Sequence, residues 1–198
     1  MLADYSVRPA RMLEPSAGVG VFVDSMLRHS PNADVMAFEK DLLTGTILRH
    51  LYPDQKMRTC GFEKIERPFN NYFDLAVSNI PFGDIAVFDP EFQRSDSFGR
   101  RSAQKAIHNY FFLKGLDAVR DGGIVAFSIL RIFLKTVRAC PFTSISQKNV
   151  WQPAGTPYWG MWGSVRYIPC LGLVIIPVFT ALSRKSMEYH RKSLRICR

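Results

Sequence analysis

Short apolar segments alternate with amphipathic segments over residues 1–128. This alternation is typical of βαβ units that build a parallel sheet. The segment 74–78, DLAVS, is apolar on both faces, as a central parallel strand is expected to be. We therefore predict an α/β fold with a doubly wound, Rossmann-like sheet, with strands at 11–13, 35–38, 56–60, 74–78 and 124–127 and helices at 21–28, 42–51 and 109–119.

The pattern changes at residue 129, so we predict two domains, 1–128 and 129–198. The first holds 15 Lys and Arg against 16 Asp and Glu, and the second holds 11 Lys and Arg against one acid, Glu188. The second also contains all three tryptophans and shows no clean hydrophobic period. It is either an irregular binding module or a sequence never selected for this fold, such as a frame-shifted tail. The sudden loss of acids favours the latter.

Composition narrows the class of protein. Apolar residues make up 47% of the chain and charged residues 22%, which is ordinary for a soluble globular domain. The four cysteines, at 60, 140, 170 and 197, match no zinc or redox spacing. We therefore expect free thiols in a reducing cytoplasm and no metal. No apolar signal region opens the chain, and the longest apolar run, 171–182, is too short to span a bilayer.

A glycine-bearing turn follows the first predicted strand and precedes a helix. It reads Glu14-Pro15-Ser16-Ala17-Gly18-Val19-Gly20, and its two glycines allow the backbone to approach a ligand closely. A dinucleotide-binding turn needs a third glycine where Val23 stands, which argues against a pyrophosphate ligand. The turn is either an ordinary βα connection or a site for a zwitterionic ligand such as S-adenosylmethionine, whose ammonium or sulfonium group Glu14 would face.

Two more positions fit a nucleoside ligand. Glu39 closes the second strand 19 residues after Gly20, where a carboxylate can accept hydrogen bonds from both ribose hydroxyls. It is otherwise a surface residue before a helix, and Asp41 is a competing helix cap. Phe62 follows the third strand and is expected either to stack on the adenine ring or to belong to the core.

The loop after the fourth strand has the clearest chemistry. It reads Asn79-Ile80-Pro81-Phe82-Gly83 and lies where ligands bind in open α/β sheets, outside the carboxyl ends of the strands. Asn79 supplies an acceptor and a donor, Pro81 stiffens the turn and Phe82 supplies a flat face. This combination predicts a pocket for a planar group with an exocyclic amine, unless the loop is a strand-end turn with a buried phenylalanine.

The segments EPSAGVG and SNIPFG, in this order, resemble the N6-adenine DNA methyltransferase family. The family's usual Asn-Pro-Pro-Phe or Asn-Pro-Pro-Tyr signature has Ile80 in place of its first proline here. The segments MAFEKDLLTG and SFGRRSAQKAIHNYFFLKGLDAVRDGGIVAF further resemble the methylase segment of large methylase–helicase proteins of bacterial mobile elements. The resemblance covers residues 8–127. It implies S-adenosylmethionine as cofactor, with the binding residues Glu14, Pro15, Ala17, Gly18, Gly20, Glu39, Lys40, Phe62 and Asn79.

The resemblance also implies a mechanism. The target adenine of double-stranded DNA is flipped out of the helix and stacks on Phe82. The Asn79 side-chain oxygen and the Ile80 carbonyl accept its two amino hydrogens, so that the nitrogen lone pair can attack the methyl group. The catalytic residues are therefore Asn79, Ile80, Pro81 and Phe82. DNA contacts are expected from Phe82, Arg94, Arg100, Arg101, His108 and Asn109, although each of these has a plain structural interpretation as well.

The target-recognition region and the C-terminal strands that proteins of this family usually carry are not recognisable in residues 129–198. We expect a fragment of a larger protein, separated from target-recognition and helicase regions. We also expect the sheet to lack its C-terminal strands, which would expose an edge and give marginal stability. The alternatives are a methyltransferase for a protein glutamine or an RNA base amine, a non-catalytic fragment that binds S-adenosylmethionine or nothing, and a nucleic-acid-binding module centred on 129–198.

Overall fold

The computed structural model describes residues 8–128, 166–168 and 173–177. They form one seven-stranded sheet in the order β3-β2-β1-β4-β5-β7-β6. The strands are β1 (Arg11–Glu14), β2 (Asp34–Phe38), β3 (Lys56–Arg58), β4 (Phe73–Asn79), β5 (Val119–Ser128), β6 (Arg166–Ile168) and β7 (Leu173–Pro177). The first five strands are parallel, and the doubly wound fold predicted from the sequence is confirmed.

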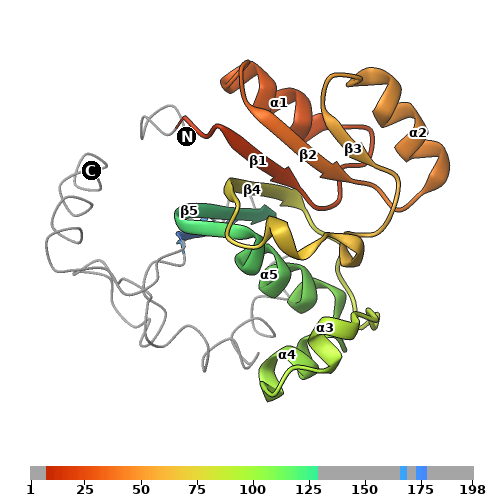
Figure 1. Ribbon diagram of the computed structural model, residues 1–198, viewed down its shortest axis with the longest axis vertical. Coiled ribbons are helices and arrows are strands. Elements are labelled where there is room, and N and C mark those ends of the chain that lie inside the picture. The colour runs from red at the N-terminus through yellow and green to blue at the C-terminus, as the bar shows by residue number, and fades with distance from the viewer. Residues whose placement is uncertain (1–7, 129–165, 169–172, 178–198) are drawn as a thin grey trace, which may run out of the picture.

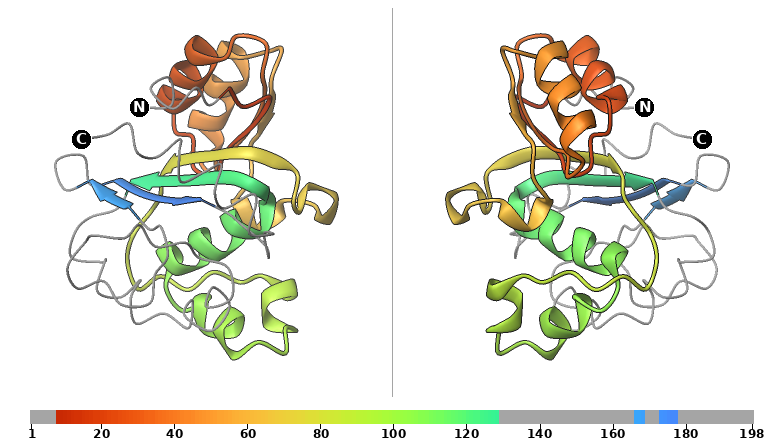
Figure 2. Two further views of the ribbon diagram at one scale, coloured as in Figure 1. Left: turned by 90° about the vertical axis from the view of Figure 1, so that its left-hand side faces the viewer. Right: turned by 90° about the vertical axis from the view of Figure 1, so that its right-hand side faces the viewer.

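Helices cover both faces of the sheet. They are α1 (Val21–His29), α2 (Leu42–Leu51), α3 (Pro90–Gln93), α4 (Phe98–Ala103) and α5 (Ile107–Ala118). Figure 2 shows α1 and α2 on one face and α3, α4 and α5 on the other. Two short 3₁₀ helices, Phe62–Lys64 and Arg67–Phe69, lead from β3 to β4. The segment between β4 and α5, for which no helix was predicted, contains α3 and α4.

The two faces have separate cores because successive side chains of a strand point to opposite sides. Met12 and Leu75 pack beneath α1 and α2, together with Val23 and Leu48. Leu13 belongs to the other core, which the aromatic residues of α5 dominate. Both clusters are buried, so β1 and β4 are apolar on both faces, as the DLAVS segment predicted.

Helix α2 has the predicted bounds but not the expected burial. Leu48 is fully buried, whereas Leu43, Ile47 and Leu51 are exposed. The helix approaches the sheet through Gly45, where an added Cβ would lie 2.7 Å from the Thr59 side chain. The close approach through a glycine therefore leaves Leu43, Ile47 and Leu51 at the surface of α2.

The expectation that the sheet lacks its C-terminal strands is wrong. β7 pairs antiparallel with β5, from Ile124↔Pro177 to Ser128↔Leu173, and β6 pairs with β7. The apolar run 173–177 covers the edge of β5 that the sequence seemed to leave open, and this pairing removes the argument for marginal stability. The rest of the predicted segment 129–198 lies outside the described residues. No helix of the described part is long and apolar enough to cross a membrane.

Candidate functional site

β1 lies between β2 and β4, so the loops that follow these three parallel strands meet at one edge of the sheet (Figure 1). In the turn after β1, Gly18 and Gly20 have φ angles of 56° and 93°, in the left-handed region that side chains disfavour. A Cβ on Gly20 would lie 2.5 Å from Tyr52 and 2.8 Å from Leu48. The Tyr52 hydroxyl donates to the Gly20 carbonyl (3.2 Å). Tyr52 therefore contacts the turn at Gly20 and stabilises it, a role that the sequence analysis did not predict.

The middle of the turn is attached to β2. Pro15 and Ala17 are buried, and the Ala17 N–H donates to the Phe38 carbonyl (2.9 Å). Gly18 is followed by exposed Val19 and by Gly20, after which α1 begins. The backbone of the turn is thus fixed at both strands while its outer side remains accessible.

Glu39 follows β2 and contacts the turn after β1. Its two carboxylate oxygens accept the N–H groups of Gly18 (2.8 Å) and Asp41 (2.8 Å). Asp41, and not Glu39, caps α2: its side chain accepts a hydrogen bond from the Thr44 N–H (2.8 Å). The Glu39 side chain can therefore contact the turn after β1. Each Glu39 oxygen keeps a second lone pair for a hydroxyl donor. Lys40 is exposed beside it.

Glu14 is the buried charge-bearing group of the site. Its side chain is 0% exposed, and neither carboxylate oxygen has a hydrogen-bond partner of good geometry among the described residues. Burial raises the pKa of Glu14 well above its ordinary value, although the Ser78 hydroxyl and the Ser16 backbone act in the opposite direction. The Ser78 hydroxyl, from β4, is likewise buried, and it acts on Glu14 as a hydrogen-bond donor.

The predicted loop follows β4 directly. Asn79 is its first residue and is exposed, Ile80 is 1% exposed, and Pro81 and Phe82 are half-buried. Phe82 packs against the core beneath α5. The left-handed Gly83 (φ 131°) then turns the chain away from the sheet. The buried Ile80 side chain anchors the loop, which leaves the Asn79 side chain on its accessible side.

His108 and Asn109 lie in the first turn of α5 behind this loop. His108 is fully buried, and burial lowers its pKa, while the Gly83 backbone and the Asp84 carboxylate act to raise it. The Asn109 side-chain oxygen is buried and has no hydrogen-bond partner among residues that the structure describes. His108 therefore supports the loop from inside, and its predicted contact with DNA would have to pass through the loop.

Phe62 does not fit its predicted stacking role. The ring is 1% exposed and packs against Phe38 (5.6 Å between centroids) and Phe111 (5.4 Å). It has no open face for an adenine ring, because three aromatic side chains fill that part of the core. The alternative, that Phe62 belongs to the core, is what the structure shows.

The predicted DNA-contacting arginines separate into two kinds. Arg94 and Arg101 are exposed. Arg100 instead forms an ion pair with Asp117 of α5, and its guanidinium lies 5.1 Å from the centre of the Phe92 ring. Arg100 therefore joins α4 to α5 through Asp117, and its predicted contact with phosphates stays a prediction.

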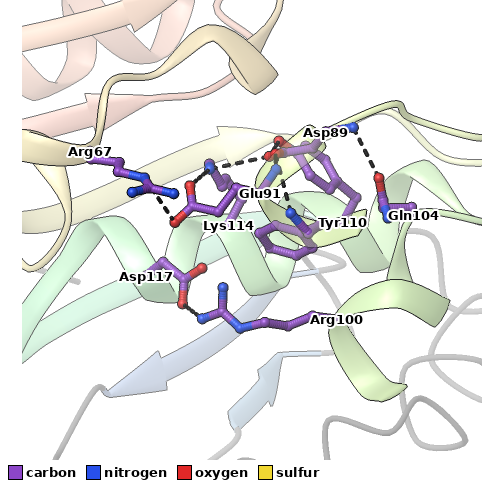
Figure 3. A network of polar contacts seen from close by, with 9 residues as sticks. Arg67, Asp89, Glu91, Arg100, Gln104, Tyr110, Lys114 and Asp117 are labelled. Atoms are coloured by element: carbon purple, nitrogen blue, oxygen red, sulfur yellow. Dashed lines mark hydrogen bonds and ion pairs between the residues drawn. The ribbon is translucent and has the colours of Figure 1, made fainter. Parts of the chain in front are cut away.

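A buried polar network fastens the segment between β4 and α5, and sequence analysis missed it (Figure 3). Asp89 caps α3 and accepts a hydrogen bond from the Tyr110 hydroxyl (2.7 Å). The Lys114 ammonium lies 3.2 Å from Asp89 and 3.2 Å from Glu91, at 3% exposure. Asp89-Pro90 is a helix-start signal, but nothing local indicates that its partners lie on α5.

No cluster of potential metal ligands occurs among the described residues. The glycine turn after β1, the Glu39 carboxylate after β2 and the Asn79–Gly83 loop after β4 lie at the same edge of the sheet.

No protein-family model matches the chain. Over 127 residues it is 31% identical to the "Defense against restriction protein B" of Escherichia phage P1, across 61% of this chain. The chain spans only 5% of the length of that phage protein.

Solved structures identify the fold. A Listeria monocytogenes protein assigned to the class I S-adenosylmethionine-dependent methyltransferases superposes with a TM-score of 0.56 at 15% identity, over 88% of this chain and 55% of its own. This chain has the class I methyltransferase fold. An S-adenosylmethionine-dependent O-methyltransferase of Thermotoga maritima gives 0.52 at 12% identity, over 91% of this chain and 63% of its own. A 16S rRNA (adenine(1408)-N(1))-methyltransferase mutant of Catenulisporales acidiphilia gives 0.51 at 11% identity, over 91% and 90%.

Proposed function

We propose that the chain transfers a methyl group from S-adenosylmethionine to the exocyclic N6 amine of adenine in DNA. The observation that carries the proposal is the position of Asn79-Ile80-Pro81-Phe82 at the end of β4, beside the glycine turn of β1, in a class I methyltransferase fold. The phage P1 protein is named for defence against restriction, a process directed at DNA, and this name supports DNA as the acceptor.

The cofactor would bind at the turn after β1. Gly18 and Gly20, with their left-handed backbone, would let the main chain approach the cofactor closely. The Glu39 carboxylate would accept hydrogen bonds from the two ribose hydroxyls. Glu14 would face the ammonium group of the cofactor's methionine part. Pro15, Ala17, Lys40 and Asn79 would complete its surroundings. When bound, S-adenosylmethionine supplies the methyl group that its sulfonium activates.

The loop after β4 would hold the acceptor. Double-stranded DNA presents the amine only after the adenine is flipped out, and Phe82 would stack on the extruded base. The Asn79 side-chain oxygen and the Ile80 carbonyl would accept the two amino hydrogens, which directs the nitrogen lone pair at the methyl group. The carbonyl role is compatible with isoleucine at position 80, because it uses the main chain. Catalysis would come from positioning and oriented dipoles.

The exposed Arg94 and Arg101 suit phosphate contacts beside this loop. Asn109 and His108 would influence the bound DNA indirectly, because they would support the loop that carries Phe82. Helicase and target-recognition regions of a longer protein would supply sequence preference.

The test is methylation of DNA from a methylation-deficient host by the purified chain, with N6-methyladenine measured by mass spectrometry after nuclease digestion. Asn79→Ala should lower the rate roughly 10²–10³-fold, the usual effect of removing one oriented polar group from an active site. Asn32→Ala, in the exposed turn between α1 and β2, is the matched control and should leave the rate unchanged.

RNA and a glutamine peptide serve as competing acceptors in the same assay. Methylation of either one without methylation of DNA would reject DNA as the substrate and leave a methyltransferase of another specificity. S-adenosylmethionine binding without transfer to any acceptor would reject the enzyme and leave a cofactor-binding fragment.

A further inference from the structure

Two large apolar side chains are exposed directly after the Asn79–Gly83 loop. Ile85 is 59% exposed and Phe88 is 70% exposed. The left-handed Gly83 (φ 131°) directs the chain away from the sheet just before them. A Cβ added to Gly83 would lie 3.7 Å from the Ile85 side chain. Ile85 therefore lies against the loop, and Phe88 follows it three residues later.

The backbone on both sides of Phe88 is fixed. Val87 packs against the core and Asp89 is 2% exposed, so Phe88 lies between two inward-facing residues and points outward. The Val87 N–H donates to the Gln104 carbonyl (2.8 Å). The Asp89 N–H donates to the Gln104 side-chain oxygen (2.9 Å; Figure 3). An exposed aromatic ring on a fixed backbone is prepared for a contact, because little conformational freedom is left to lose on binding.

Cationic side chains occur in the same segment. Lys105 directly follows the residue that holds the backbone on both sides of Phe88. The exposed charged residues of 84–105 are three cations, Arg94, Arg101 and Lys105, and two acids, Asp84 and Asp96. Positive charge beside exposed apolar side chains suits nucleic acid, because phosphates and the faces of bases can be contacted together.

We propose that Phe88 is a wedge that enters the base stack of duplex DNA beside the extruded adenine, with Ile85 between it and the Asn79–Gly83 loop. Extrusion of a base costs unpairing and unstacking free energy and leaves a gap in the stack. An apolar side chain that fills the gap recovers part of this cost, as apolar wedges do in proteins that kink DNA. The inference rests on the proposed function, because it takes double-stranded DNA as the acceptor.

Phe88 is thus a positioning residue, separate from Phe82. Phe82 would stack on the extruded base within the site, whereas Phe88 would contact the bases that remain in the helix. Its effect should therefore appear in the extrusion step and not in the affinity for S-adenosylmethionine. This difference makes the role measurable.

The experiment begins with the wild-type chain and DNA from the methylation-deficient host. Sequencing of the N6-methyladenine that it forms locates the target position. A synthetic duplex is then made with 2-aminopurine at that position, because the fluorescence of this base rises when it leaves the stack. Fluorescence at saturating protein reports extrusion, and the anisotropy of an end-labelled duplex reports affinity.

Phe88→Ala should lower the equilibrium constant for extrusion roughly 5–100-fold, the range for the loss of one base–aromatic stack. The fluorescence should therefore stay low even at saturation. Phe88→Leu keeps an apolar wedge and should retain most of the fluorescence rise. Because Phe88 is exposed, both variants should unfold in urea as the wild type does.

Two further variants separate the wedge from other effects. Arg101→Ala would remove a phosphate contact, so it should weaken binding and still give the full fluorescence rise at saturation. Leu51→Ala changes an exposed apolar residue of α2, which covers the opposite face of the sheet from α3 (Figure 2). It is the matched control and should behave as wild type in both measurements.

Each result decides between the proposals. A full fluorescence rise at saturation with Phe88→Ala would overturn the wedge, whether or not the affinity falls, and would leave the proposed function intact. A wild-type protein that methylates the site without any fluorescence rise would overturn the wedge as well. Failure of the folded wild-type chain to methylate any DNA would reject both proposals.

Discussion

Gly20 combines a left-handed backbone with close contact to two side chains. Gly20→Ala would add both backbone strain and a clash with Tyr52 and Leu48, so we expect the free energy of unfolding to fall by about 2–4 kcal/mol. Gly18→Ala is the matched control, because no atom lies within 4 Å of its added Cβ. It should cost about 1 kcal/mol, the strain of a left-handed residue alone. Urea unfolding of both variants measures the difference, and equal losses would contradict this account of the turn.

Residues of one chemical type have different roles within this site. Asp41 caps a helix, whereas Glu39, two positions earlier, holds the Gly18 N–H and faces the turn. Arg100 is paired with Asp117, whereas Arg101 beside it is exposed. Substitutions at Arg101 should therefore affect DNA binding, and substitutions at Arg100 should affect stability. Residue type alone does not separate the two.

At the scale of elements, α5 organises the face of the sheet that carries the Asn79–Gly83 loop. Its first turn supports that loop through His108, and its middle holds α3 through Tyr110 and Lys114. Asp89 joins these parts, and its pKa is lowered: burial acts to raise it, but the Tyr110 hydroxyl, the Lys114 charge and a backbone N–H outweigh burial. The segment between β4 and α5 is thus fixed at a buried ionic cluster rather than by apolar packing alone.

Lys114→Met tests this cluster. It keeps much of the side-chain volume but leaves the Asp89 carboxylate buried without its cation, so we expect a loss of about 3–5 kcal/mol of unfolding free energy. Arg28→Met removes a cation from the exposed Asp24–Arg28 pair of α1 and should cost less than about 0.5 kcal/mol. Urea denaturation at neutral pH compares the two variants. Similar small losses would show that the cluster contributes no more than a surface pair.

At the scale of the whole molecule, strands distant in sequence complete the sheet. β7 lies between β5 and β6, so every backbone N–H of its middle residues faces a neighbouring strand. Ile175→Pro would remove one of these donors from an interior strand, where proline is not accommodated. We expect the melting temperature to fall by about 2–4 °C for each kcal/mol lost, while Ile175→Val leaves it nearly unchanged. An unaltered melting temperature for Ile175→Pro would contradict the pairing of β5 with β7.

Local patterns were sufficient to predict the five parallel strands and the helices α1, α2 and α5. The apolar segments 35–38 and 74–78 predicted β2 and β4, because a strand buried on both faces must be apolar throughout. The glycine turn and the Asn79–Gly83 loop were predicted to lie together, since the carboxyl ends of adjacent parallel strands share one edge. The order of these segments along the chain carries that information.

Contacts between distant segments determined which strands pair and which single side chains are buried. β7 pairs with β5 although 44 residues, 129–172, separate them, and no local signal in 173–177 indicates its partner. Phe62 is core rather than ligand-facing because Phe38 and Phe111 enclose it. Glu14 ends the strand as a polar residue in the sequence, and its complete burial became visible only in the tertiary structure. Burial and pairing depend on which surfaces meet, and composition and periodicity do not encode that for single residues.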